Sequence, residues 1–194
     1  TGDPDFDRDG TGVEITDGDV TALSLFQATL PAPRQVLPGE PALRKAVAEG
    51  AALFETIGCA VCHVPALRLD TPVFVEPGPF NLEGTLRRSE VERPVTVALA
   101  PSGPVEVRAY TDLKRHRICD ADAPHFCNER TVQGFAPTDE FLTKRLWEAG
   151  STDPYGHRKD LTTLREAILH HGGEAAGARR AFQELAPDAQ GAVI

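Results

Sequence analysis

Two cysteines and a histidine within five residues are the clearest chemical signal in this sequence. Residues 59–63 read C-A-V-C-H, so the thiols of Cys59 and Cys62 stand three positions apart and His63 follows directly. Two thiols at this spacing can each add to one vinyl group of the same porphyrin, and the next histidine then reaches the iron. The pattern therefore predicts one covalently bound haem c, with His63 as an axial ligand.

Two other chemistries use a C-x-x-C pattern. A thioredoxin-like redox motif follows a strand and begins a helix, whereas here a helix is predicted before the motif and Pro65 interrupts the segment after it. A structural zinc site needs two more ligands. Cys119 and Cys127 are available, but the seven residues between them make a poor zinc knuckle. Haem is favoured, and both alternatives stay open at this point.

The sixth iron ligand is not given by the motif. Most small c-type cytochromes use a methionine sulfur, and this chain contains no methionine. The remaining nitrogen candidates are the other five histidines, His116, His125, His157, His170 and His171. Judged from the residues alone, the sixth ligand could also be a lysine or a tyrosine, or the sixth position could be open.

The segment 141–174 resembles the C-terminal haem domain of the bacterial di-haem cytochrome c peroxidase superfamily. Within it, the likeness is greatest to the di-haem oxidoreductase group, also called thiol-oxidoreductase-like. The group's signature is P-Y-x-H, six varied positions, then L-x-E-A-[IV]. It is matched here by P-Y-G-H at 154–157 and L-R-E-A-I at 164–168. The stretch around the haem motif and Y-T-D-L at 110–113 are similar to that group as well.

The resemblance implies a sixth ligand. In the peroxidases a methionine ligates the electron-transfer haem fourteen residues after the histidine of P-Y-x-H, and the oxidoreductase group tends to have histidine there. Fourteen residues after His157 stands His171, in the context H-H-G-G-E. The resemblance therefore implies His63/His171 ligation, with His157 as a pocket residue, a propionate partner or a fallback ligand, and His116 as the third choice. If His171 is not a ligand, the alternative is a solvated residue at a helix end that interacts with the helix dipole.

This sequence departs from the family in carrying one C-x-x-C-H motif rather than two. We expect electron transfer by a single bis-histidine haem, in a carrier or relay more than in an independent enzyme. One alternative is the electron-transfer half of a di-haem oxidoreductase or peroxidase, with the other haem domain removed, on another chain or never present. Another is a haem-relay subunit of a larger redox complex. In each case the expected partner is a redox protein.

The elements that must position these residues are mostly helical. Helices are predicted at 17–28, 40–57, 163–171 and about 174–185, and one β-hairpin at 95–100 and 105–110. Pro41 suits the first turn of the second helix, Gly58 its end, and Gly50 would let another helix approach closely. Thr163 and Glu166 form a capping-box pattern. The fold class is therefore mostly α, a cytochrome c-type haem domain with long irregular loops.

The first 38 residues differ from the rest. They are acidic and end in a proline-rich linker, so we expect residues 1–38 to be an N-terminal segment and 39–194 to be the haem domain. Asp5, Asp7, Asp9 and Gly10 match the first half of an EF-hand loop and are a candidate calcium site, although Thr16 stands where the closing glutamate belongs. A solvated acidic terminus explains them equally well.

Charge and compartment limit the remaining functions. A net charge of −9 argues against nucleic acid and against anionic membranes, and no apolar run is long enough for a transmembrane helix. Haem c is attached outside the cytoplasm, where thiols oxidise, so a Cys119–Cys127 disulfide and a periplasmic or other extracytoplasmic location are expected. Because no methionine is present, we expect Thr1 to begin a processed chain or a fragment.

Overall fold

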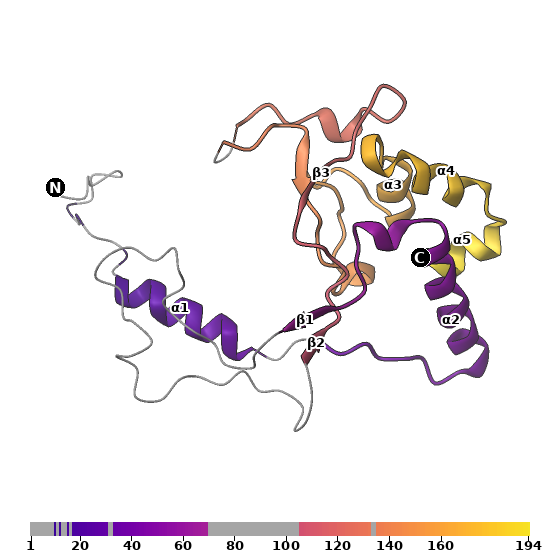
Figure 1. Ribbon diagram of the computed structural model, residues 1–194, viewed down its shortest axis with the longest axis horizontal. Helices are drawn as coiled ribbons and strands as arrows, with labels where there is room; N and C mark the ends of the chain where they lie inside the picture. Colours follow the sequence, from indigo (N-terminus) through magenta and orange to yellow (C-terminus); the bar gives the residue numbers. More distant parts are fainter. Residues whose placement is uncertain are drawn as a thin grey trace. The chain divides into compact units, whose positions relative to one another are not determined.

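The computed structural model describes residues 10, 12, 15, 17–30, 33–69, 105–132 and 135–194 (Figure 1). The chain divides into two compact units, one of Thr1–Ala32 with Arg68–Glu106, the other of Pro33–Leu67 with Val107–Ile194. The second unit contains the C-x-x-C-H motif and all six histidines. The expected boundary between residues 38 and 39 stays a prediction.

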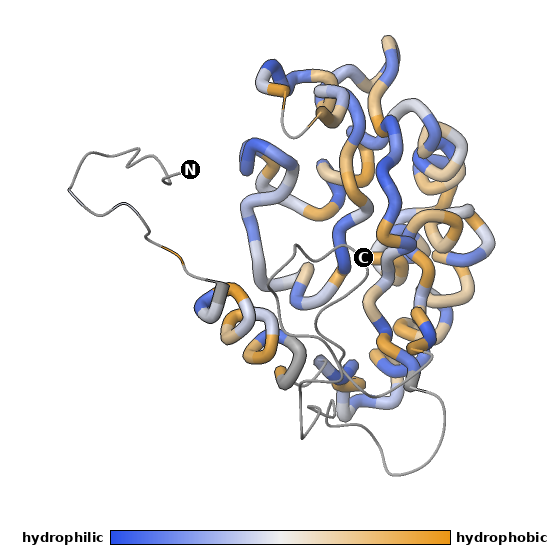
Figure 2. The backbone as a smooth tube through the Cα atoms, turned by 60° about the vertical axis from the view of Figure 1, so that its left-hand side comes forward, coloured by the Kyte–Doolittle hydropathy of each residue, from blue (hydrophilic) through white to orange (hydrophobic). Residues whose placement is uncertain are grey.

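In the first unit the main described element is helix α1 (Asp17–Thr29), which confirms the helix predicted at 17–28. Its apolar side chains are largely exposed, with Val20 at 51%, Leu23 at 56% and Phe26 at 61%. Figure 2 shows these apolar turns alternating with hydrophilic ones along the helix. Asp5, Asp7 and Asp9 lie outside the described residues, so the calcium loop stays a prediction.

Helix α2 (Pro41–Thr56) confirms the prediction for 40–57, with proline in the first turn. It packs against α5 (Pro187–Val193), beside it in Figure 1. Gly50 is buried at the crossing, and a Cβ atom there would overlap the main-chain carbonyl of Ala192. The predicted close helix approach is thus confirmed. The partner α5 was not predicted, because a seven-residue segment beginning with proline carries too little periodicity.

Two short helices follow each other near the end of the chain. Helix α3 (Leu164–Leu169) begins at the predicted capping box: the Thr163 side chain accepts from the Glu166 N–H, and the Glu166 carboxylate accepts from the Thr163 N–H. A 3-10 turn, η5 (Gly173–Ala175), leads into α4 (Ala176–Glu184), which confirms the helix expected at about 174–185.

The described strands are short and make two sheets of two strands each. In one, β1 (Leu67–Leu69) pairs with β2 (Val105–Val107); in the other, β3 (Arg115–Arg117) pairs antiparallel with β4 (Glu140–Leu142). The mostly α prediction with one hairpin therefore needs correction to helices with two small strand pairs. Three-residue strands are too short to show the alternation that predicts them. Residues 95–100, the first half of the predicted hairpin, lie outside the described residues.

The core of the second unit surrounds a disulfide between Cys119 and Cys127, whose Cα atoms are 5.6 Å apart. The bond confirms the predicted pairing. Cys119, Phe126 and Leu161 are buried together, and Tyr155 packs against them. Within the described residues, further 3-10 turns are η1 (Cys59–Val61), η3 (His125–Cys127) and η4 (Ala149–Ser151).

Candidate functional site

The C-x-x-C-H residues lie on one tight turn directly after α2. Gly58 ends the helix in the left-handed conformation (φ 94°), which glycine adopts without a Cβ clash. The following 3-10 turn is closed by the His63 N–H, which donates to the Cys59 carbonyl at 3.0 Å. One turn thus projects both thiols and the imidazole, which is the local arrangement that haem c attachment requires.

The His63 ring is fixed by a long-range hydrogen bond. Its Nδ1 donates to the main-chain carbonyl of Tyr110 at 3.0 Å, 47 residues away in the sequence. Because a carbonyl only accepts, the proton is on Nδ1, and Nε2 is the nitrogen that can bind a metal. Burial lowers the pKa of His63, opposed by the carbonyls of Tyr110 and Lys144 and by the Asp112 charge. The ring is therefore neutral at pH 7, as a metal ligand must be.

His171 repeats this arrangement at the end of α3. Its Nδ1 donates to the Ala167 carbonyl at 2.6 Å, which again leaves Nε2 for a metal. Burial lowers the pKa of His171, opposed by the Ala167 carbonyl, and protonation would be disfavoured further by the nearby His63 and His170.

The disulfide loop and the Gly-Gly pair support His171 from the other side. The Phe126 ring, inside the loop closed by Cys119 and Cys127, meets the His171 ring edge to face at 5.6 Å. The Gly172 N–H donates to the Ile118 carbonyl at 2.8 Å, and the Gly173 N–H to Asp120 Oδ2 at 2.7 Å. At either glycine a Cβ would meet main-chain atoms of residues 117–123 too closely, so the pair permits this contact.

The other histidines are engaged elsewhere in the second unit. His157 Nε2 pairs with Glu129 Oε2 at 2.9 Å, and its ring lies 5.0 Å from Phe141. His125 pairs with Asp160 at 3.1 Å and stacks on His170. For His157, the structure shows a carboxylate partner, and its part in cofactor binding stays a prediction.

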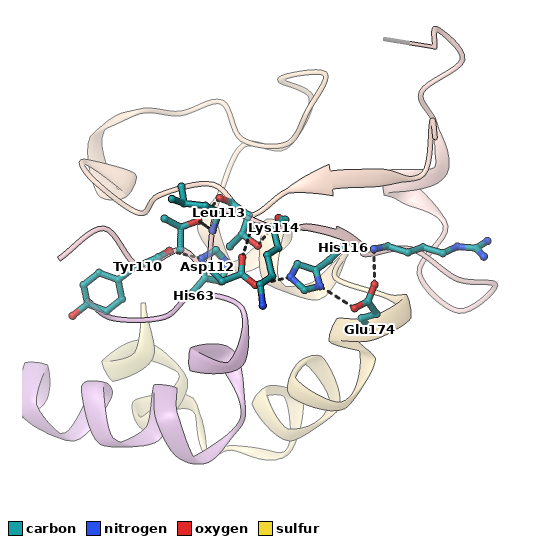
Figure 3. A network of polar contacts seen from close by, with 10 residues as sticks. His63, Tyr110, Asp112, Leu113, Lys114, His116 and Glu174 are labelled. Atoms are coloured by element: carbon teal, nitrogen blue, oxygen red, sulfur yellow. Dashed lines mark hydrogen bonds and ion pairs between the residues drawn. The ribbon is translucent and has the colours of Figure 1, made fainter. Parts of the chain in front are cut away.

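His116 lies between two carboxylates, with Asp112 on Nε2 and Glu174 on Nδ1, both at 2.8 Å (Figure 3). Sequence reasoning considered His116 only as a third-choice ligand and missed both of its partners. It also missed the Tyr110 carbonyl as the acceptor of His63. Glu174 and the Tyr110 carbonyl stand 58 and 47 residues from their partners and leave no local pattern, whereas Asp112 is only four residues from His116 and could have been considered.

The cysteines argue against the two alternative chemistries. Burial raises the pKa of the Cys59 and Cys62 thiols, whereas a redox-active C-x-x-C depends on a lowered one. Cys119 and Cys127 are bonded to each other and cannot complete a zinc site. Among the described residues there is no group of three or more His, Cys, Asp or Glu side chains arranged to bind a metal ion.

These residues fit a haem. Two thiols and one imidazole come from a single turn, and a second imidazole, directly after the end of α3, has the same nitrogen available. Each imidazole has its Nδ1 on a main-chain carbonyl, which is how histidine ligands of metals are normally oriented.

The sequence model of one protein family, described as "Di-haem oxidoreductase, putative peroxidase", matches residues 5–194. The chain belongs to the di-haem oxidoreductase family. Membership confirms the resemblance seen in the sequence and implies haem as the cofactor and a haem-based redox or peroxidase role. No curated protein and no solved structure matched the chain.

In this member of the di-haem oxidoreductase family, the described part includes no helix that is long and apolar enough to cross a membrane.

Proposed function

We propose that the chain binds one haem c through Cys59 and Cys62, with His63 and His171 as axial ligands, and that it transfers electrons. The observation that carries the proposal is the matched pair of imidazoles. Burial lowers the pKa of both rings, both donate from Nδ1 to a main-chain carbonyl, and both therefore leave Nε2 for the iron. When bound, the haem would supply a one-electron redox centre. A cytochrome c-type fold of residues 39–194 is part of this proposal.

The protein's own residues would orient the ligands and exclude water. The carbonyls of Tyr110 and Ala167 keep each Nε2 aimed away from its own backbone. Phe54 meets Tyr110 edge to face at 5.9 Å and lies 6.3 Å from His63, while Phe126 covers His171. Two nitrogen ligands leave no position for peroxide and give a lower reduction potential than a His/Met pair.

The partner would be a redox protein, met outside the cytoplasm. The Cys119–Cys127 bond supports an oxidising, periplasmic or otherwise extracytoplasmic location. The net charge of −9 favours a basic partner, whose association with this chain should slow as salt increases.

A second candidate follows from the family itself. Its members are di-haem proteins, whereas this sequence has one C-x-x-C-H. The chain would then be the electron-transfer half of an oxidoreductase or peroxidase, or a relay subunit in a larger complex. Peroxide turnover by the purified chain separates a carrier from an enzyme, and the size of the protein in native extracts separates a carrier from a subunit of a larger complex. Turnover with a spectrum that is six-coordinate at rest contradicts the carrier proposal, and its absence supports it.

The ligand assignment is tested by mass and by spectroscopy. The denatured chain should retain one haem by intact mass, and the Cys59→Ala, Cys62→Ala double variant should retain none. The oxidised protein should be low-spin without the band near 695 nm that a methionine ligand gives. His171→Ala should become high-spin or bind added imidazole. An unchanged spectrum in that variant, with a change in His157→Ala, would move the sixth ligand to His157.

The calcium loop at Asp5, Asp7 and Asp9 is a separate proposal that rests on the sequence pattern alone. Equilibrium dialysis against calcium should show one bound ion, lost in the Asp5→Asn, Asp7→Asn double variant. Equal calcium in both proteins contradicts it.

A further inference from the structure

A polar bridge connects the two chain segments that carry the proposed axial ligands. Asp112 stands two residues after Tyr110, whose carbonyl accepts from His63, and Glu174 stands three residues after His171. The His116 ring lies between these carboxylates and contacts one oxygen of each at 2.8 Å. Figure 3 shows His63 at the Tyr110 carbonyl and, beside it, the contacts from Asp112 through His116 to Glu174. We call Asp112, His116 and Glu174 the polar bridge.

The polar bridge is charged at its centre. Carboxylates only accept hydrogen bonds, so both ring nitrogens of His116 donate and the ring is an imidazolium. The hydrogen bond that His116 donates to Glu174, and then the one it donates to Asp112, raise the pKa of His116. The His116 side chain is 17% exposed and that of Asp112 10%, while Glu174 is 55% exposed. The Asp112 contact is thus the more sheltered from solvent of the two, and charge-assisted bonds of this kind are stronger than neutral ones.

The Asp112 end is anchored in the loop that supports His63. Asp112 Oδ1 accepts from the Lys114 N–H at 3.0 Å. Thr111 is buried, donates to the Thr143 carbonyl at 2.6 Å and accepts from the Leu113 N–H at 3.0 Å. These bonds stabilise a loop in which Tyr110 and Leu113 have positive φ angles (53° and 58°), which non-glycine residues adopt only at a cost. The loop positions the Tyr110 carbonyl.

The Glu174 end is anchored next to His171. Glu174 Oε1 accepts from the Arg117 N–H at 2.8 Å, beside the Gly172 bond to the Ile118 carbonyl. Glu174 therefore ties the turn after His171 both to the backbone of β3 and, through His116, to Asp112. A change in the polar bridge should alter the position of His171, because only the two anchored glycines, Gly172 and Gly173, separate it from Glu174.

We propose that Asp112, His116 and Glu174 are positioning residues that retain His171 on the haem iron and so control how readily an external ligand replaces it. The proposal rests on the His63/His171 ligation proposed above. The bridge touches neither iron nor substrate. It restricts the motion that His171 would need in order to leave.

The experiment compares two matched glutamates in the oxidised, haem-loaded protein, with imidazole as the probe. Glu174 and Glu129 each accept from main-chain N–H groups with one oxygen and pair with a histidine through the other, at 2.8 and 2.9 Å. Stopped-flow mixing with saturating imidazole measures how fast His171 dissociates. E174Q should raise this limiting rate about five- to tenfold, H116Q should raise it in the same direction, and E129Q should stay within about twofold of wild type.

A double-variant arm separates positioning from a general loss of structure. In the His171→Ala background the sixth ligand is already gone, so E174Q should no longer change imidazole binding. An effect that persists there overturns the proposal, as does an E174Q rate equal to that of E129Q. If His171→Ala itself leaves the wild-type spectrum unchanged, the ligand assignment fails instead, which distinguishes the two failures.

Discussion

Breaking the Cys119–Cys127 disulfide tests how much the loop that supports His171 depends on its covalent closure. Cys127 is exposed, whereas Cys119 is 1% exposed and lies in the core with Phe126 and Leu161. Cys127→Ser therefore removes the bond at its solvent end and leaves the core atoms of Cys119 in place. The variant isolates the crosslink from any cavity effect.

The expected magnitude follows from the length of the closed loop. The cysteines are eight positions apart. Closing a loop of this size lowers the entropy of the unfolded chain by an amount worth about 2.5 kcal/mol at 25 °C. Cys127→Ser should reduce the free energy of unfolding by about that much.

Cys127→Ser should also affect the proposed haem site. The loop presents Phe126 to the His171 ring, and its neighbours Ile118 and Asp120 accept from Gly172 and Gly173. A looser loop should therefore weaken His171 ligation before the whole chain unfolds. We expect high-spin haem to appear at a lower urea concentration than the loss of helical circular dichroism.

Urea unfolding of the haem-loaded protein, with and without a thiol reductant, provides the assay. Reduced wild type should unfold like Cys127→Ser, and the variant itself should not respond to the reductant. The reasoning would be refuted if reduction lowered the free energy of unfolding of the wild-type protein by less than about 0.5 kcal/mol. It would also be refuted if reduction further lowered the free energy of unfolding of Cys127→Ser.

Three further predictions concern the helices and the polar bridge. Gly50→Ala should destabilise the protein by about 1–3 kcal/mol, because the new Cβ overlaps the α5 main chain. Gly191→Ala should be neutral or stabilising, because a Cβ there has nothing within 4 Å. Equal urea midpoints for the two variants would contradict the close contact between α2 and α5 at Gly50. Thr163→Ala should cost about 1 kcal/mol by loss of the helix cap, with Thr163→Ser close to wild type in thermal unfolding. The stability difference between wild type and His116→Gln should depend on pH. It should fade above pH 6.5 as His116 loses its proton through its raised pKa, and again in acid as Asp112, whose pKa is lowered to about 2, is protonated. A difference that grows steadily above pH 7 would rule out the charged bridge.

Local signals in the sequence were enough to place the haem motif and most helices. The proline and glycine at the ends of α2, the capping box of α3 and the C-x-x-C-H turn each depend on residues within a few positions of one another. The Cys119–Cys127 pairing also followed from the sequence, because the loop is short and the expected compartment oxidising. The family resemblance supplied His171 as a candidate ligand, which the residues alone left among five histidines.

The surroundings of those residues depended on the tertiary structure. His63 finds its acceptor 47 positions away at Tyr110, and His116 finds Glu174 58 positions away. The short strands and α5 likewise are stabilised by the elements they pack against or pair with, and their own sequences show no pattern that would predict them. The sequence therefore determined the chemistry and the local turns, since both depend on near neighbours. Only the tertiary structure decided which carbonyls and carboxylates support the proposed ligands, because long-range hydrogen bonds leave no periodic trace in the chain.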